Sequence, residues 1–229
     1  VHIIIIAIIH ILTKKENQKM SHFLTLVFTK KNGKTVEELL APFDRNIEYA
    51  PYVLYTKEQA IAKIRKDIEA CANGWYAEYL ADPKIYEKNC DNKAHLDYIK
   101  NEFPKRLNWT DDECYEEMKS RFEEDMVKPN GDLLSTYNPN AKWDYYTIGG
   151  AWDKCLHTDK TQVNKAFAKK VNWEGCIPVA FITPTGEWHE NNKEGWWTEE
   201  GKRNWKIEFE RFISSLDEDI MVTVVDCHM

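Results

Sequence analysis

Two histidines lie at the ends of two apolar segments that are far apart in the chain. His22 precedes the segment FLTLVF, and Asp226-Cys227-His228 follow IMVTVV. If the segments are neighbouring antiparallel strands, His22 and His228 face each other and can act as general acid and base near neutral pH. Such a pair can cleave a phosphodiester without a metal ion, with Asp226 orienting an imidazole. The alternative is that both histidines only cap strand ends at the surface.

The sequence allows two further kinds of chemistry, nucleophilic attack by a cysteine and the binding of a metal ion by histidine and glutamate. Cys227 could act as a nucleophile with a histidine as its base, although adjacent residues on a strand point to opposite faces. His189 lies between Glu187 and Glu190 and has the ligand types for a divalent metal, but this spacing is a weak signal. We therefore expect no metal site and no cofactor.

The segment NPNAKWDYYTIGGAW, residues 138–152, is the strongest local motif. Glycines let the backbone approach a ligand or adopt positive φ, and flat aromatic rings can stack on a base. No Lys-Ser/Thr follows the glycines, so this is not a phosphate loop. The alternative is that the tryptophans belong to the core and the glycines form a bulge. The predicted ligand-binding residues are Trp143, Asp144, Tyr145, Gly149, Gly150 and Trp152.

Several motifs together resemble a family of phage and bacterial proteins to which no reaction has been assigned. They are MSHF at 20–23, APF at 41–43, the central NPN-x-KWD-x-Y-x-x-GG-x-W, EGWW at 194–197 and TVVDCH at 223–228. In that family the central motif more often ends GG-Arg-Trp, whereas this chain has Ala151, so an anion-binding role does not carry over at that position. The resemblance implies a compact intracellular protein of phage type and supplies no reaction.

The elements that must position these residues can be read from the hydrophobic pattern. Segments 21–28 and 220–226 are apolar on both faces, as central strands are. Further strands are predicted at 143–148 and 177–182, a hairpin turn at 183–186, a loop at 128–142, and helices at 57–73, 161–170 and 198–216. This order predicts an α+β fold with a mostly antiparallel, ferredoxin-like sheet, helices packed on it, and a helical insertion at about 75–127 within a single domain, 20–229.

Capping boxes are predicted where Thr35, Thr56 and Thr110 each precede a Glu or Gln by three residues. The third opens an acidic helix to about Met126, with eight acids in 111–125. A solvated helix face is the plainer interpretation, and a surface for a basic protein partner is the alternative.

Residues 1–19 contain the apolar run VHIIIIAIIHIL, which is short for a spanning helix and lacks the flanks of a signal peptide. We expect Met20 to be the biological start and 1–19 to be a leader or disordered tail; the alternative is an interfacial anchor. Without 1–19, which hold three Lys and one Glu, the net charge of −7 becomes −9.

An acidic chain without a Lys/Arg run lacks the footprint of a duplex-binding protein. The six cysteines form no CxxC pair, and we expect reduced thiols in a cytoplasmic protein with no membrane contact.

The functional hypothesis is an intracellular phage-type protein in the host cytoplasm that binds, and in its enzymatic form cleaves, a nucleotide or nucleotide defence signal. The alternative is a protein-binding inhibitor that uses the acidic helix; a homo-oligomer stays open.

Overall fold

The computed structural model describes residues 22–159, 161–191 and 198–229. The predicted leader at 1–19 and the EGWW motif at 194–197 lie outside the described residues. The chain divides into two compact units: the first holds the chain up to Glu48 and again from Tyr137, and the second spans Tyr49–Thr136. The second unit therefore covers a longer stretch of the chain than the insertion predicted at about 75–127.

The first unit is built on one sheet whose centre is β1 (His22–Lys30) and β11 (Ile220–His228). The strand order is β10-β9-β1-β11-β4, and β7 pairs with β11 beside β4. Only β1 and β9 are parallel among these pairs. The predictions of an α+β fold, a mostly antiparallel sheet and two central strands at its middle are confirmed. The remaining strands are β4 (Tyr145–Ile148), β7 (Lys165–Phe167), β9 (Ala180–Ile182) and β10 (Trp188–Glu190).

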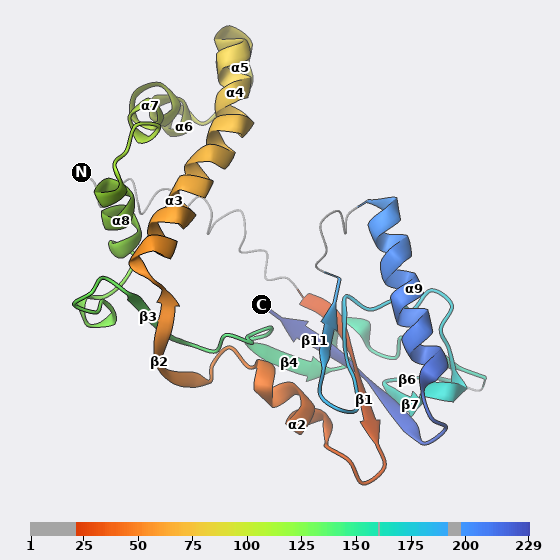
Figure 1. Ribbon diagram of the computed structural model, residues 1–229. Helices are drawn as coiled ribbons and strands as arrows, with labels where there is room; N and C mark the ends of the chain where they lie inside the picture. The colour runs from red at the N-terminus through yellow and green to blue at the C-terminus, as the bar shows by residue number, and fades with distance from the viewer. Residues whose placement is uncertain (1–21, 160, 192–197) are drawn as a thin grey trace. The chain divides into compact units, whose positions relative to one another are not determined.

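Each face of this sheet is covered by one helix. Helix α9 (Glu199–Ser215) lies along β1 and β11 and packs Trp205 and Phe209 on one face (Figure 1). Helix α2 (Val36–Leu40) packs Leu39 and Leu40 on the other. Because strand residues alternate between faces, Leu24, Leu26 and Phe28 meet α9, whereas Val27, Val225 and Cys227 meet the α2 side. We call these the α9 face and the α2 face. A small sheet, β6-β5-β8, joins the unit through β5 (Leu156–Thr158), β6 (Gln162–Val163) and β8 (Val171–Asn172).

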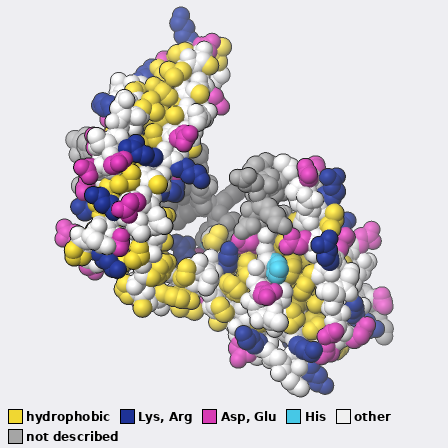
Figure 2. All heavy atoms as spheres, in the orientation of Figure 1, with side chains coloured by type: hydrophobic (Ala, Val, Ile, Leu, Met, Phe, Trp, Pro, Cys, Tyr) yellow, Lys and Arg dark blue, Asp and Glu magenta, His cyan; other side chains and the backbone are white. Residues whose placement is uncertain are grey.

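The second unit is mainly helical. Its long helix α3 (Lys57–Cys71) buries Ala60 and Ile64 against Cys114 and Met118 of α8 (Asp111–Lys119). Hydrophobic side chains also lie exposed on its surface (Figure 2). Leu80 is among the exposed large hydrophobic residues. Its other elements are β2 (Glu48–Tyr55) and β3 (Leu133–Tyr137), which pair at the boundary with the first unit, and α4 (Ala77–Ala81), α5 (Pro83–Asn89), α6 (Lys93–Asp97) and α7 (Phe103–Arg106), with π-helical turns at Ala72–Tyr76 and Tyr98–Glu102.

The three predicted capping boxes are present: the hydroxyls of Thr35, Thr56 and Thr110 accept the expected backbone N–H bonds. Three predictions made from local pattern are wrong. The acidic helix expected to reach about Met126 ends at Lys119, and only a 3-10 turn at Glu124–Met126 follows it. Segment 161–170 forms short strands and a 3-10 turn instead of a helix, because β7 pairs with β11 and buries Ala166 in the core. Segment 128–142 is not all loop, because Leu133–Tyr137 pairs with β2 and buries Leu133.

No helix among the described residues is long and apolar enough to cross a membrane. All six cysteines carry free thiols.

Asn138, the first asparagine of the NPN motif, anchors the chain to the segment after α2 at the point where the chain re-enters the first unit. Asn138 is 4% exposed, and its Nδ2 donates to the carbonyl oxygens of Pro42 and Asp44, both at 2.9 Å. Its Oδ1 accepts the backbone N–H of Asn140 at 2.9 Å. The side chain thereby satisfies three backbone groups, two of them just after α2.

Replacing Asn138 by Asp should destabilise the protein by about 3 kcal/mol, because a carboxylate would face two carbonyl oxygens in a buried site. Asn140→Asp, at an exposed position two residues away, is the matched control and should change stability by less than about 0.5 kcal/mol. Urea unfolding followed by tryptophan fluorescence measures both. Equal midpoints for the two variants would contradict this role for Asn138.

Candidate functional site

The β1–β11 register brings the two terminal histidines together. His22 is paired directly with His228, so both side chains leave the sheet on the α9 face. Their ring centroids are 5.3 Å apart and the rings meet edge to face. The antiparallel pairing that this prediction required is therefore present.

Each histidine has a carboxylate of its own. Nδ1 of His22 lies 2.9 Å from Oδ1 of Asp226, and Nδ1 of His228 lies 2.6 Å from Oδ1 of Asp144. An ionised carboxylate only accepts hydrogen bonds, so each Nδ1 carries the proton and donates it. We call these two pairs the histidine dyads. A carboxylate on Nδ1 fixes the orientation and tautomer of a neutral ring and leaves Nε2 as the basic nitrogen.

The two Nε2 atoms lie in different surroundings. Nε2 of His228 is buried and has no hydrogen-bond partner among the described residues. Nε2 of His22 lies 3.5 Å from the hydroxyl of Tyr145, at the outer limit of a hydrogen bond. The His22 side chain is 37% exposed and that of His228 only 9%. A ligand that reaches the dyads from solvent therefore meets His22 first.

The glycine turn of the central motif makes room for the Asp226 carboxylate and directs a backbone N–H to it. Both glycines have positive φ, 78° at Gly149 and 54° at Gly150. A Cβ atom at Gly150 would lie 2.3 Å from Cβ and from Oδ2 of Asp226, so a side chain cannot fit there. The turn directs the backbone N–H of Ala151 to Oδ2 of Asp226 at 2.8 Å. The backbone at position 151 makes this contact, so the alanine in place of arginine leaves it intact.

Tyr145 is the one predicted aromatic residue that lies at the dyads with an exposed ring. It is paired with His228 in the β4–β11 register, stacks on that imidazole at 4.7 Å between centroids, and is 45% exposed. Asp144, the next residue along the chain, is predicted above only as a ligand contact. Its role as the partner of His228 has no local signal, because 84 residues separate the two.

Trp143 and Trp152 belong to the core, as the alternative interpretation of the motif has it. Trp143 is 6% exposed, donates its indole N–H to the carbonyl oxygen of Leu40, and packs against Tyr146 on the α2 face. The strand predicted at 143–148 begins only at Tyr145, as β4, so Trp143 lies before it. Trp152 packs half-buried against the core of the α9 face. We leave both out of the proposed ligand surface.

Cys227 is not placed to act as a nucleophile. Its side chain is fully buried on the α2 face, opposite the dyads. Burial raises the pKa of its thiol to about 12, so almost none of it is thiolate at neutral pH.

A separate cavity of about 720 Å³ is lined in part by Trp188 and His189 of β10. Phe43 and Trp188 line it with ring centroids 5.0 Å apart, and Lys142 is paired with Glu190 at 2.6 Å on its wall. His189 stacks on Phe181 at 4.7 Å. No dyad residue lines this cavity. Within the described residues, no three or more His, Cys, Asp and Glu side chains are grouped to hold a metal ion.

No protein-family description, curated protein or solved structure matches the chain. The candidate site therefore rests on its own geometry.

Gly150→Ala should displace the Asp226 carboxylate and destabilise the protein by about 2 kcal/mol or more, because overpacking adds to the strain of positive φ. Gly175→Ala is the matched control, since Gly175 also has positive φ (78°) but nothing lies within 4 Å of the added Cβ. Urea unfolding compares the two variants. Equal losses would show that the contact with Asp226 does not matter.

Cys227 should resist alkylation by iodoacetamide in the folded protein at pH 8, because a pKa of about 12 leaves about one thiol in ten thousand ionised. The half-buried Cys71 and Cys90 should react under the same conditions. Peptide mass spectrometry identifies the labelled residues, with a urea-unfolded sample as the positive control. Labelling of Cys227 at the rate of Cys71 would restore it as a candidate nucleophile.

Proposed function

We propose that this protein is an acid–base catalyst that cleaves a phosphodiester bond in a nucleotide, with His22 and His228 as the reacting groups. One observation carries the proposal: two neighbouring histidines each present Nδ1 to a separate carboxylate, Asp226 or Asp144, and so keep Nε2 for proton transfer.

The reaction divides between the two rings. One neutral imidazole takes a proton at Nε2 from the attacking hydroxyl, either of water or of a ribose. The oxygen of that hydroxyl bonds to phosphorus, and the other imidazole, protonated at Nε2, gives its proton to the leaving oxygen. Asp226 and Asp144 hold the two rings in place through Nδ1. The exposed ring of Tyr145 provides a surface on which a base can stack.

The resemblance noted above to phage and bacterial proteins suggests where the protein acts and on which class of substrate. It favours a phage-type protein in the host cytoplasm whose substrate is a host nucleotide or a nucleotide defence signal. Binding without cleavage is the neighbouring hypothesis, because the same residues could hold a nucleotide without turning it over.

The inhibitor hypothesis draws less support from the acidic segment 111–125. Five of its eight acids are already engaged within the second unit: four make ion pairs and Glu113 completes a capping box. Lys57, Arg65, Arg106, Lys119 and Arg121 supply the cations for Asp111, Asp112, Glu116 and Glu117. This surface is close to neutral where the helix lies.

Incubation with a panel of linear and cyclic nucleotides, followed by denaturation and chromatography, should yield cleaved product. His22→Ala and His228→Ala should each lower turnover by about 10²- to 10⁴-fold, the usual contribution of a general acid or base. His157→Ala, at an exposed histidine of the small sheet, is the matched control and should retain full activity. The rate should also show a bell-shaped pH dependence.

The other outcomes separate the hypotheses. Intact nucleotide released on denaturation would replace catalysis by binding alone. Unchanged turnover in both histidine variants would remove the dyads from the mechanism. Neither ligand nor product with any nucleotide would contradict the nucleotide assignment and favour the inhibitor.

A further inference from the structure

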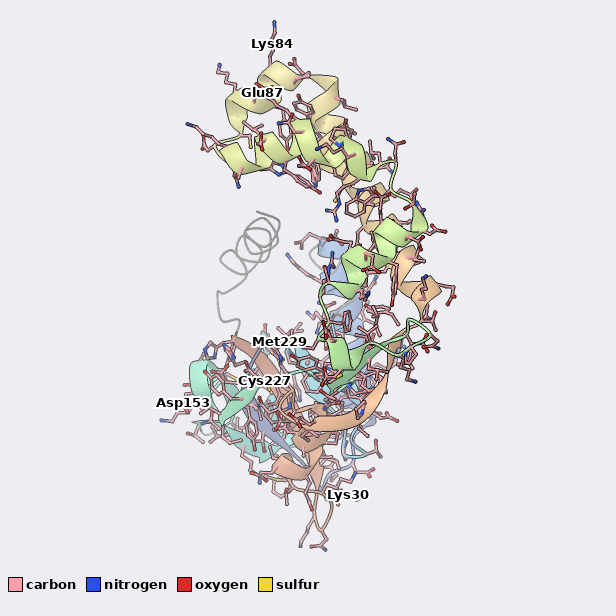
Figure 3. The ribbon with its side chains drawn as sticks, turned by 90° about the vertical axis from the view of Figure 1, so that its left-hand side faces the viewer. Lys30, Lys84, Glu87, Asp153, Cys227 and Met229 are labelled. Atoms are coloured by element: carbon pink, nitrogen blue, oxygen red, sulfur yellow. The ribbon has the colours of Figure 1, made fainter. Side chains whose placement is uncertain are left out.

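The α2 face of the sheet holds a second cavity, of about 460 Å³. It lies between the turn after β1, the start of α2, and strands β7 and β11. Three lysines line it, Lys30, Lys34 and Lys165, against one acid, Glu37. We call it the lysine pocket. Its volume falls in the range of small-molecule sites. Lys30 lies at the far end of β1 from the dyads (Figure 3).

The positive charge of the lysine pocket is largely uncompensated. Lys30 has an exposed ion pair with Asp217 at 3.4 Å. Lys34 and Lys165 make no ion pair in the part of the chain that the structure describes. In a protein with 38 acids and 31 basic residues, two lysines without an ion pair, Lys34 and Lys165, beside a single acid mark a local reversal of charge. Such a cavity attracts anions.

A buried hydroxyl on the wall of the pocket lacks a partner. Thr223 lines the pocket and is 3% exposed, and its Oγ1 makes no hydrogen bond within the described part of the chain. Thr223 lies directly opposite Lys165 in the β7–β11 register, so both side chains leave the sheet on the α2 face. A buried polar group without a partner carries a desolvation cost, which a ligand oxygen in the pocket would relieve.

We propose that the lysine pocket binds the phosphate groups of a small molecule, with Lys34 and Lys165 as the charged contacts and Thr223 as a hydrogen-bond donor. Lysine ammonium groups and hydroxyls are common phosphate ligands. The site is distinct from the dyads, because Asp226 and His228 leave β11 on the α9 face. A molecule with two phosphates can contact several lysines at once, so a diphosphate should bind more tightly than a single phosphate.

Titration calorimetry of the full chain with inorganic pyrophosphate tests the charged contacts. The double variant Lys34→Met/Lys165→Met should bind at least about tenfold more weakly, through loss of two charge-assisted contacts. Lys66→Met/Lys84→Met is the matched control: it removes the same charge from exposed positions in the second unit, Lys84 near its end (Figure 3), and should bind as the parent does. An equal loss of pyrophosphate affinity in both double variants would show that only the net charge of the protein matters, and would overturn the site.

Thr223→Val tests the unpartnered hydroxyl without changing the charge or size of the side chain. Because the hydroxyl makes no hydrogen bond in the free protein, the variant should be at least as stable in urea as the parent. It should nevertheless bind pyrophosphate several-fold more weakly. Unchanged affinity would overturn the role of Thr223, and no binding of pyrophosphate by the parent protein would overturn the pocket as a phosphate site.

Two further arms identify the source of the phosphate groups. A nucleoside diphosphate that binds more tightly than pyrophosphate, and loses this affinity in Lys34→Met/Lys165→Met but not in His22→Ala, would assign the pocket to nucleotides; equal affinities for the two ligands would assign it to the phosphates alone. Sulfate at matched ionic strength separates specific binding from screening: affinity for sulfate equal to that for pyrophosphate would contradict a built phosphate site. None of these variants should change turnover at the dyads, so failure of this site and failure of the proposed catalysis are distinguishable.

Discussion

The pairing of β1 with β11 is the constraint on which the first unit depends. Its nine residue pairs run from His22 with His228 to Lys30 with Ile220. Since side chains alternate between faces, this one register sends Leu24, Leu26 and Phe28 to α9 and also brings the two histidines together. A slip of one strand by one residue would exchange its side chains between the α9 face and the α2 face and disrupt the packing of both, so the core itself maintains the geometry of the dyads.

The residues of the central motif have two structural roles: some anchor the segment to α2, and others support the histidine dyads. Asn138 and Trp143 fasten the segment to the end of α2 through bonds to backbone carbonyls. Asp144 and Gly150 then supply the support for the dyads, one as a carboxylate and one by making room for Asp226. Because the fastening residues are buried, the supporting residues hold their positions. The motif is therefore chiefly a frame for two histidines, and only Tyr145 offers an open aromatic surface beside them.

Local patterns in the sequence predict what depends on local physics. The capping boxes, helix α3 and the two strands with apolar faces all follow from spacing within a few residues. The strand β7 does not, because Lys-Ala-Phe has no strand preference apart from its partner β11. The same holds for the site: facing histidines follow from two central strands, but the bond from Asp144 to His228 and the contact of Gly150 with Asp226 depend on a register that joins distant segments.

Strand β11 separates the two proposed sites while carrying residues of both. Thr223 faces the lysine pocket, and Asp226 and His228 face the opposite side. Backbone pairing with β1 on one side and with β4 and β7 on the other leaves this strand no freedom to shift without breaking its register. A ligand in the lysine pocket therefore acts on the dyads through the stability of the folded unit, which rises with ligand concentration, and not through a change in their geometry. The two sites are best regarded as independent in chemistry and coupled only by folding.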